Sequence, residues 1–274
     1  MFIQRLITSL VLAPLMLAGI YLLPADYFSL FIGLIVVLAA WEWANLAGYS
    51  RATTRLTVAI AGAAILLGVD WWRLSAEISW QTLMIAAVIW WLLALLLALT
   101  YPGSQTVIRR RWVRLLMGVP VLVPFWLGLN VLKGRDDDAL VLTWLMLLVW
   151  GADIGAYFAG RAFGNRKLAP NVSPGKTWAG VYGGMATSIL VSVVVALSFL
   201  PPLTAMQWLA LVLVSALLVA ISVLGDLLES LLKRYRGIKD SSQLLPGHGG
   251  VLDRIDSLCA ATPLFCLLLV VISV

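Results

Sequence analysis

The sequence predicts an all-α membrane protein that crosses the bilayer many times. Of its 274 residues, 62% are hydrophobic and only 12% are charged, whereas soluble domains are about a quarter charged. Apolar runs of about 18 residues or more, long enough to cross a bilayer as helices, recur along the chain. They leave no stretch long enough for a separate soluble domain, so we expect one integral membrane domain over residues 1–274.

Nine membrane spans are predicted. They cover residues 5–23, 27–47, 56–70, 80–100, 114–132, 139–160, 178–199, 206–229 and 257–273. The third is short and is the weakest as a full crossing. No small-residue cleavage pattern precedes Asp26, so the first run is expected to be a retained helix rather than a signal peptide.

The distribution of basic residues predicts the orientation. With the N-terminus in the cytoplasm, all of the 19 lysines and arginines except Arg73, Lys133 and Arg135 fall on the cytoplasmic side. This asymmetry follows the positive-inside rule. The net charge of +6 is therefore assigned to a surface beside the bilayer and not to nucleic-acid binding. The cluster 109–114 is interpreted as a topology marker of this kind.

Several acids are predicted at membrane depth, where a charge is costly and usually functional. Asp153 lies near the end of the sixth span, and Asp226 and Glu229 share one face of the eighth. The residue four positions after Asp226 is Ser230, so Asp226 has no local basic partner and a functional role is favoured. Glu229 has Lys233 at that spacing, and a structural ion pair is the better interpretation.

The segment PGHGGVLDRID, residues 246–256, predicts an anion site. Pro246 and the glycines around His248 make a tight turn that cannot be helical, and a helix is expected from about Val251. Backbone N–H groups of such a turn, together with a helix N-terminus, bind groups of phosphate size. Asp253 and Asp256 follow on that helix. Carboxylates beside an anion site indicate a bridging divalent cation, and oxygen ligands favour magnesium.

The segment NVSPGKTWAG, residues 171–180, resembles the first in character. A turn at Ser173 is followed by Lys176 and Thr177. It does not match a Walker A loop, because no glycine lies at the required distance before Gly175. Lys167 and Lys176 are candidates for phosphate binding, with snorkelling at a helix end as the alternative, stronger for Lys167. Glu42, farther upstream, is interpreted as a buried structural acid outside the site.

At these residues the sequence resembles the phosphatidate cytidylyltransferases, also called CDP-diacylglycerol synthases. The fixed positions of the family signature are all matched, by Ser230, Lys233-Arg234, Lys239-Asp240, Pro246, His248-Gly249-Gly250, Asp253-Arg254 and Asp256. The segments 151–164 and 167–180 resemble a second family region. One departure is Ala179, where relatives often carry Glu or Gln. The resemblance is strong over 140–260 only.

The resemblance implies that CTP and phosphatidic acid react to give CDP-diacylglycerol and pyrophosphate. It implies a metal centre at Asp226 and Asp253 that holds Mg²⁺ and a second cation, K⁺ or Mg²⁺, with Asp256 and Asp153 as further candidate ligands. The residues expected to bind the triphosphate and the lipid phosphate are Lys167, Ser173, Lys176, Thr177, Lys233, Arg234, Lys239, His248, Gly249, Gly250 and Arg254.

The expected catalytic group within these sets is Asp226, Lys233, Arg234, Lys239 and Asp253. Residues 139–274 would form the catalytic portion and 1–138 an N-terminal helical bundle, with a polar cleft at the cytoplasmic interface. Relatives of this kind act as homodimers in the bacterial inner membrane. A phosphate monoester is mostly dianionic at neutral pH, so the lipid phosphate needs no general base. His248 is therefore expected to bind phosphate, with loop shaping as the alternative.

Other functions remain in competition with this reading. Closest are enzymes with the same cleft, such as a cytidylyltransferase for archaeal-type lipids or a CTP-dependent polyprenol kinase. A CDP-alcohol phosphotransferase would need an Asp-x-x-Asp-Gly run with Ala-Arg soon after, which the sequence lacks. A transporter would place its acids near mid-membrane within repeats or broken helices, whereas here they cluster toward one interface.

Overall fold

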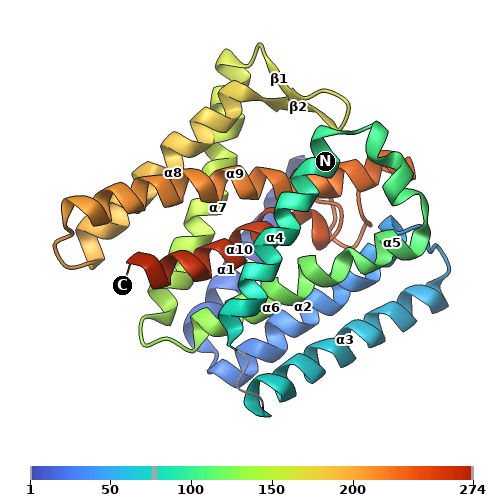
Figure 1. Ribbon diagram of the computed structural model, residues 1–274, viewed down its shortest axis with the longest axis horizontal. Coiled ribbons are helices and arrows are strands. Elements are labelled where there is room, and N and C mark those ends of the chain that lie inside the picture. The colour runs from blue at the N-terminus through green and yellow to red at the C-terminus, as the bar shows by residue number, and fades with distance from the viewer. Residues whose placement is uncertain (1, 76–78, 273–274) are drawn as a thin grey trace.

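The computed structural model describes residues 2–75 and 79–272 (Figure 1). In chain order the elements are α1 (Phe2–Leu22), α2 (Ala25–Leu46), α3 (Ala52–Ser75), α4 (Trp80–Leu99), the 3-10 helix η1 (Gly103–Arg109), α5 (Arg111–Leu116), α6 (Gly118–Lys133), α7 (Asp138–Phe163), β1 (Lys167–Ala169), β2 (Ser173–Thr177), α8 (Trp178–Phe199), α9 (Ala205–Arg236) and α10 (Leu252–Ile272). The predicted helical membrane protein is confirmed.

Each predicted span overlaps a helix, the fifth the α5–α6 pair, and the predicted ends differ most at α3, α9 and α10. The third is longer than expected, because α3 has 24 residues. In the described ranges, seven helices are long and apolar enough to cross a membrane: α2, α3, α4, α5–α6, α7, α8 and α9. The apolar part of α1, Ile7–Leu22, is shorter, and α10 begins with charged residues.

Helix α9 runs well past its predicted end and carries Lys233 and Arg234 of the signature. Thr204 and Gln207 form a capping box at its N-terminus. Its C-terminus is set by Gly237, whose φ of 73° is a left-handed conformation that glycine adopts without strain. Lys233, Arg234 and Arg236 therefore lie in its last turn, where cations suit the helix dipole.

Two short strands are the exception to the all-α prediction. They pair antiparallel, with Lys167 opposite Thr177 and Ala169 opposite Ser173, and the hairpin stands beyond the ends of α7 and α8 (Figure 1). Both Ala169 and Ser173 precede a proline, which disfavours the helical conformation for the residue before it. Two such positions in one short linker favour extended chain over a simple turn.

The core is built where α10 packs against α4, α6 and α9. The ring of Trp144 on α7 meets Phe265 on α10 edge-on, with centroids 5.6 Å apart. Trp144 donates its ring N–H to the hydroxyl of Ser192 at 3.2 Å, and Ser192 lies 2.7 Å from the hydroxyl of Ser215. Polar groups inside a bilayer need such internal partners because no water is available to them.

Arg114 is more than a topology marker. Its side chain is 4% exposed. The guanidinium donates to the carbonyl of Ala47 at 3.1 and 2.9 Å and to that of Arg109 at 3.0 Å, and also to the carbonyl of Ile108. It thereby provides donors for the carbonyl of Ala47 at the end of α2 and for two carbonyls at the end of η1, positions where helices leave carbonyl groups without intrahelical partners. This arginine joins α2 to the η1–α5 segment.

Candidate active site

The loop between α9 and α10 forms the predicted tight turn. Gly247 and Gly249 have φ values of 76° and 84°, which glycine adopts at low cost. The N–H of Leu245 donates to the carbonyl of Gly249 at 2.8 Å, and the N–H of His248 donates to the carbonyl of Leu245 at 2.9 Å. Helix α10 begins at Leu252, one residue after the predicted start.

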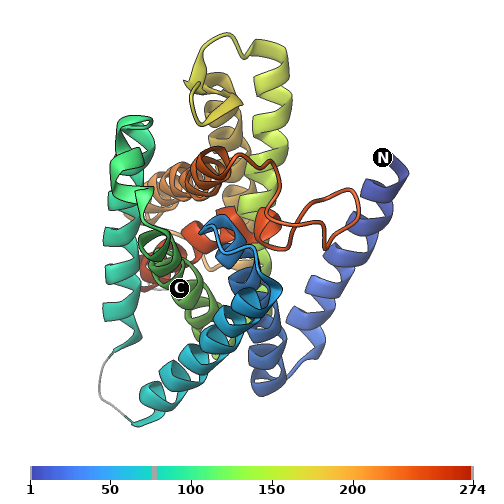
Figure 2. The same cartoon turned by 90° about the vertical axis from the view of Figure 1, so that its right-hand side faces the viewer.

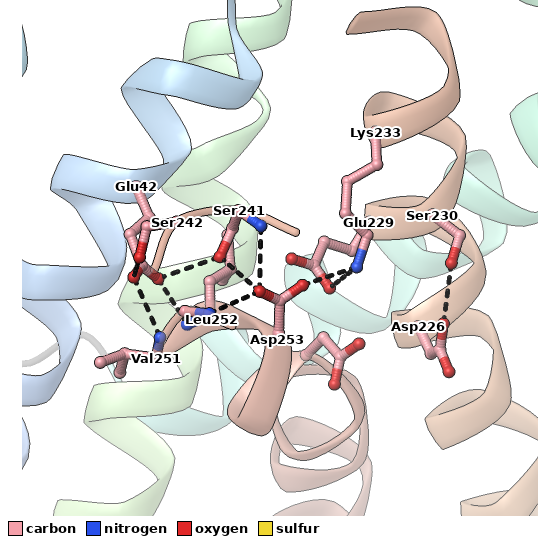
Figure 3. A network of polar contacts seen from close by, with 12 residues as sticks. Glu42, Asp226, Glu229, Ser230, Lys233, Ser241, Ser242, Val251, Leu252 and Asp253 are labelled. Atoms are coloured by element: carbon pink, nitrogen blue, oxygen red, sulfur yellow. Dashed lines mark hydrogen bonds and ion pairs between the residues drawn. The ribbon is translucent and has the colours of Figure 1, made fainter. Parts of the chain in front are cut away.

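Asp253 connects this loop to α9 (Figure 3). Its Oδ2 accepts hydrogen bonds from the N–H and hydroxyl of Ser241, at 2.9 and 2.8 Å, and from the N–H of Gly250 at 2.7 Å. Its Oδ1 lies 2.7 Å from Nζ of Lys233. Charged hydrogen bonds of this kind are the stronger class, so this carboxylate holds both ends of the loop in register with the helix.

Glu42 of α2 holds the other side of the same loop, and the site prediction missed it. Its side chain is fully buried. Its carboxylate accepts from the N–H groups of Val251 and Leu252, at 3.0 and 2.6 Å, and from the hydroxyl of Ser242 at 2.5 Å (Figure 3). A carboxylate at a helix N-terminus satisfies orphan N–H groups and complements the dipole. Glu42 is thus the buried structural acid expected, but it belongs to the site's framework.

The backbone donors expected to face a phosphate are therefore not open. The N–H groups of Gly250, Val251 and Leu252 all donate to the carboxylates of Asp253 and Glu42. The prediction of a backbone anion site is not met at these three positions. A Cβ at Gly250 would overlap the Ser241 hydroxyl, so glycine here lets the loop close around the acids. These three N–H groups are therefore engaged with carboxylates rather than open to a phosphate.

The second acid, Asp226, is held from the hairpin. Its Oδ2 lies 2.7 Å from Nζ of Lys176 on β2, and its Oδ1 accepts from the hydroxyl of Ser230 at 2.9 Å. Arg234, one turn beyond Ser230 on α9, donates to the carbonyl of Val172 at 3.1 Å. Two contacts thus fasten the hairpin to α9. The hairpin and the end of α9, far apart in sequence, therefore meet at one place.

Helices α9 and α10 approach each other closely where their acids lie. A Cβ at Gly225 would overlap the backbone carbonyl of Asp256 and would meet the Ala260 Cβ at 3.0 Å. This approach brings Asp256 beside Asp226 and Glu229. Glu229 also pairs with Lys233 at 3.0 Å, which confirms its predicted i,i+4 ion pair. The acids of α9 and α10 therefore form one cluster.

The remaining predicted residues lie around this cluster. Asp153 on α7 is an electrostatic neighbour of Asp226, Lys176 and Arg254. Nε2 of His248 lies 3.2 Å from the hydroxyl of Ser9 on α1. Thr177 caps α8 by accepting from the N–H of Gly180 at 3.1 Å, so it has a structural part. Exposed positions are occupied by Lys167, Arg234, Lys239 and Arg254, whereas Ser173 and Gly249 are partly buried.

The ligand chemistry fits a hard cation, because Asp226, Asp253 and Asp256 offer oxygen atoms only. Among residues 2–75 and 79–272, however, no three His, Cys, Asp or Glu side chains converge closely enough to hold a metal ion. A lysine stands against each of the two expected ligands, with Lys176 on Asp226 and Lys233 on Asp253, both at 2.7 Å. The donor set is present and is neutralised by the protein's own cations.

Comparison with known proteins identifies the family. The cytidylyltransferase family matches residues 3–272. The chain is 52% identical over 266 residues to a phosphatidate cytidylyltransferase of Pseudomonas aeruginosa, covering 97% of this chain and 96% of that protein. It is 41% identical over 278 residues to a phosphatidate cytidylyltransferase of Haemophilus influenzae, covering 96% of each. The chain belongs to the cytidylyltransferase family.

A third relative matches only part of this cytidylyltransferase. The phosphatidate cytidylyltransferase of Brucella suis is 45% identical over 142 residues, or 52% of this chain and 51% of that protein. The resemblance inferred from the signature is confirmed, and the chain is a nucleotidyltransferase. The acids and bases of the candidate site come together from α2, α7, the hairpin, α9 and α10, so this cluster includes Glu42 from the first 138 residues as well as residues of 139–274.

Proposed function

We propose that this chain is a phosphatidate cytidylyltransferase, which converts CTP and phosphatidic acid to CDP-diacylglycerol and pyrophosphate. The names of the two relatives that match nearly the whole chain support the substrates. The observation that carries the proposal is the paired arrangement of acid and lysine at Asp226–Lys176 and Asp253–Lys233, beside a cavity whose other walls are apolar. A site with charged and hydrocarbon surfaces together suits a reaction between a nucleotide and a lipid.

The reaction joins two polyanions. An oxygen of the lipid phosphate attacks the α-phosphorus of CTP, a new P–O bond forms, and the bond to the β-phosphate breaks to release pyrophosphate. The lipid phosphate is already mostly dianionic, so no residue has to remove a proton. The obstacle is repulsion between the substrates, and catalysis consists mainly of charge neutralisation and alignment.

The basic side chains are suited to this role. Lys176 and Lys233 lie at the acid cluster and pair with its carboxylates. If another positive charge neutralises those carboxylates, the two ammonium groups can pair with the incoming phosphates instead. Arg254, Lys239 and Arg234 are exposed around it and would receive the triphosphate and the lipid phosphate, with Lys167 at the edge. His248 contacts a hydroxyl through Nε2 and would act as a hydrogen-bonding group rather than as a base.

Magnesium is part of the proposal. Asp226 and Asp253, the two expected ligands, would hold it. Asp256, which the close packing at Gly225 brings beside Asp226, and Asp153 would be further oxygen ligands, and K⁺ or Mg²⁺ a second cation. Bound Mg²⁺ supplies positive charge that stabilises the departing pyrophosphate. The chain's part is to keep these carboxylates ionised and oriented, through Ser230 for Asp226 and through Ser241 and Gly250 for Asp253.

The membrane arrangement completes the proposal. Nine helical spans, counting α1 and α10, would place the N-terminus in the cytoplasm and put the site at the inner face of the bacterial inner membrane. The positive-inside asymmetry supports this orientation. CTP would reach the site from the cytoplasm and the lipid from the bilayer. The relatives' likeness extends over nearly the whole chain, and we expect a homodimer as in the family.

The purified full-length protein in detergent micelles tests the proposal. Pyrophosphate release and formation of CDP-diacylglycerol are measured with CTP and phosphatidic acid, with and without Mg²⁺, and with each substrate omitted. We expect both products in equal amounts and only when all three components are present. Release of pyrophosphate without lipid, or no release from folded protein, would contradict the assignment. Dolichol-type and ether-linked lipids tested in place of phosphatidic acid separate the related activities.

A further inference from the structure

A cavity of about 500 Å³ leads from the acid cluster into the membrane-facing part of the bundle. The end of the cavity at the acid cluster is polar and includes Asp153, His248 and Arg254. The rest of its wall is hydrocarbon, contributed largely by α1 and α2. Six of these apolar wall residues are Leu12, Ala13 and Met16 of α1 and Phe31, Ile35 and Leu38 of α2. The volume is in the range of ordinary ligand sites.

Helix α1 forms the outer wall of this cavity and is fixed mainly at its two ends. Near its C-terminus, the carbonyl of Ile20 accepts from Nζ of Lys133 at 2.7 Å, and Gly19 packs so closely on Phe31 that a Cβ would overlap the ring. Near its N-terminus, the hydroxyl of Thr8 donates to the carbonyl of Pro246 at 2.9 Å. Figure 2 shows α1 along one side of the bundle, with this end beside the 238–251 loop.

The contact between α1 and the loop falls at the polar end of the cavity. Ser9 lies 3.2 Å from Nε2 of His248, and both residues line the cavity. One turn farther along α1 the lining residues become apolar, beginning at Leu12 and Ala13. The wall thus changes from hydrogen-bonding to hydrocarbon within a single turn of helix. A ligand that fits this wall has an anionic or polar head joined directly to a hydrocarbon tail.

The nucleotide does not match the apolar part. Cytosine and ribose carry hydrogen-bonding groups around their edges, and polar groups buried without partners cost free energy. The wall between α1 and α2 offers hydrocarbon side chains at the positions named above. An acyl chain has no such groups and fits a narrow hydrocarbon space. The positive charge of Arg254 at the polar end of the cavity complements a phosphate attached to that chain.

We propose that the cavity between α1 and α2 holds an acyl chain of the lipid substrate, with its phosphate at Arg254 and His248 and with α1 as the wall that sets how much chain fits. The inference rests on the proposed function and adds to it the place of the lipid tail. It makes Ala13, which has the smallest side chain of the six named wall residues, a determinant of chain-length preference.

Substitution of Ala13 tests the proposal. The variants Ala13→Leu and Ala13→Phe extend a side chain into the space expected for the acyl chain. The matched control is Val11→Phe, on the same helix, at a position that is 57% exposed and does not line the cavity. For each protein, kcat/KM is measured with phosphatidates carrying two eight-carbon chains and two eighteen-carbon chains, at one detergent concentration, together with the KM for CTP.

We expect Ala13→Phe to lower the ratio of long-chain to short-chain kcat/KM by about tenfold, because overfilling an apolar site displaces whatever shares it. Ala13→Leu should lower the ratio less, and Val11→Phe should leave it unchanged. The KM for CTP should not change in any variant. An unchanged ratio in both Ala13 variants would overturn the acyl-site proposal. Wild-type protein inactive on every phosphatidate would instead overturn the proposed function.

A labelling experiment gives a readout that does not depend on turnover. Phosphatidic acid with a diazirine on one acyl chain is photolysed with wild-type protein in nanodiscs, and the adducts are located by mass spectrometry. We expect adducts within 12–16 and 31–38 that disappear when excess unlabelled phosphatidic acid is added. Adducts found only at lipid-facing positions such as Leu10 and Leu30, which are 64% and 67% exposed, and unaffected by competition, would contradict the proposal.

Discussion

Lys176 and Asp226 lie 2.7 Å apart, one on the β-hairpin and the other on α9. This ion pair joins the segment 171–180 to the helix that carries Asp226 and Glu229. Asp226 also accepts from Ser230 at 2.9 Å. The position of the hairpin and the orientation of a candidate metal ligand therefore depend on the same lysine, which can be tested by removing its charge.

Lys176→Met keeps the length of the side chain and removes the ammonium group. We expect kcat/KM for cytidylyl transfer to fall by about a hundredfold, in the range that loss of one electrostatic stabiliser produces. The control is Lys167→Met on β1, whose side chain is exposed and should matter much less. Pyrophosphate release measures both. Equal effects from the two variants would show that the hairpin contributes only diffuse positive charge.

Asp253→Ala and Asp226→Ala should differ in stability although both abolish turnover. The Asp253 side chain is only 5% exposed, and its removal takes one of the two carboxylate partners of Lys233 and the acceptor of the Ser241 N–H. Breaking a buried pair costs about 3–5 kcal/mol. Asp226 is 33% exposed, so its loss should cost much less. Thermal unfolding in detergent measures the difference, and similar melting temperatures would contradict it.

Glu42→Gln should loosen the loop although Glu42 lies on α2. The amide keeps one acceptor oxygen for Val251, Leu252 and Ser242 and loses the charge. Hydrogen bonds to charged groups are worth about 1.5–3 kcal/mol each, so we expect a clear drop in melting temperature and in activity. Asp26→Asn, an exposed acid on the same helix, is the control and should behave like wild type.

Gly225→Ala should separate α9 from α10. The added Cβ would overlap the backbone of Asp256, and overpacking of this kind costs about 1–3 kcal/mol. Both stability and activity should fall, because the acids on the two helices would no longer meet. The control is Gly68→Ala in α3, where a Cβ meets nothing within 4 Å. A Gly225→Ala protein with wild-type turnover would disprove the need for this close approach.

The helices and several acids of the candidate site were predictable from the sequence, for physical reasons. Long apolar runs specify spans, and the Glu229–Lys233 pair follows from helical spacing alone. Acids at membrane depth indicated Asp226 and Asp153. The burial of Glu42 was predicted, but its contact with the 238–251 loop and α10 was not. Its partners lie about two hundred residues away, and no periodicity predicts such a contact. The hairpin was not predicted, because serine, proline and glycine at 173–175 are typical turn residues and favoured a turn there.

The pairing of Lys176 with Asp226 and of Lys233 with Asp253 was beyond prediction. Spacing places Lys233 near Glu229, but its contact with Asp253 on the next helix depends on how α9 and α10 pack. The same applies to the N–H groups of Val251 and Leu252. Their availability to a phosphate was a sound inference from the turn alone, and it fails because a third helix brings Glu42 to them.

The position of Glu42 has a consequence for biogenesis. This acid enters the bilayer with the second helix, whereas Ser241, one of its partners, is synthesised 199 residues later. Until then the growing chain carries a carboxylate at a buried position without the donors that neutralise it, at a substantial cost in free energy. The donors to Glu42 therefore become available only when residues 241–252 have been synthesised. A ribosome that stops early should release a chain that quality-control proteases can recognise.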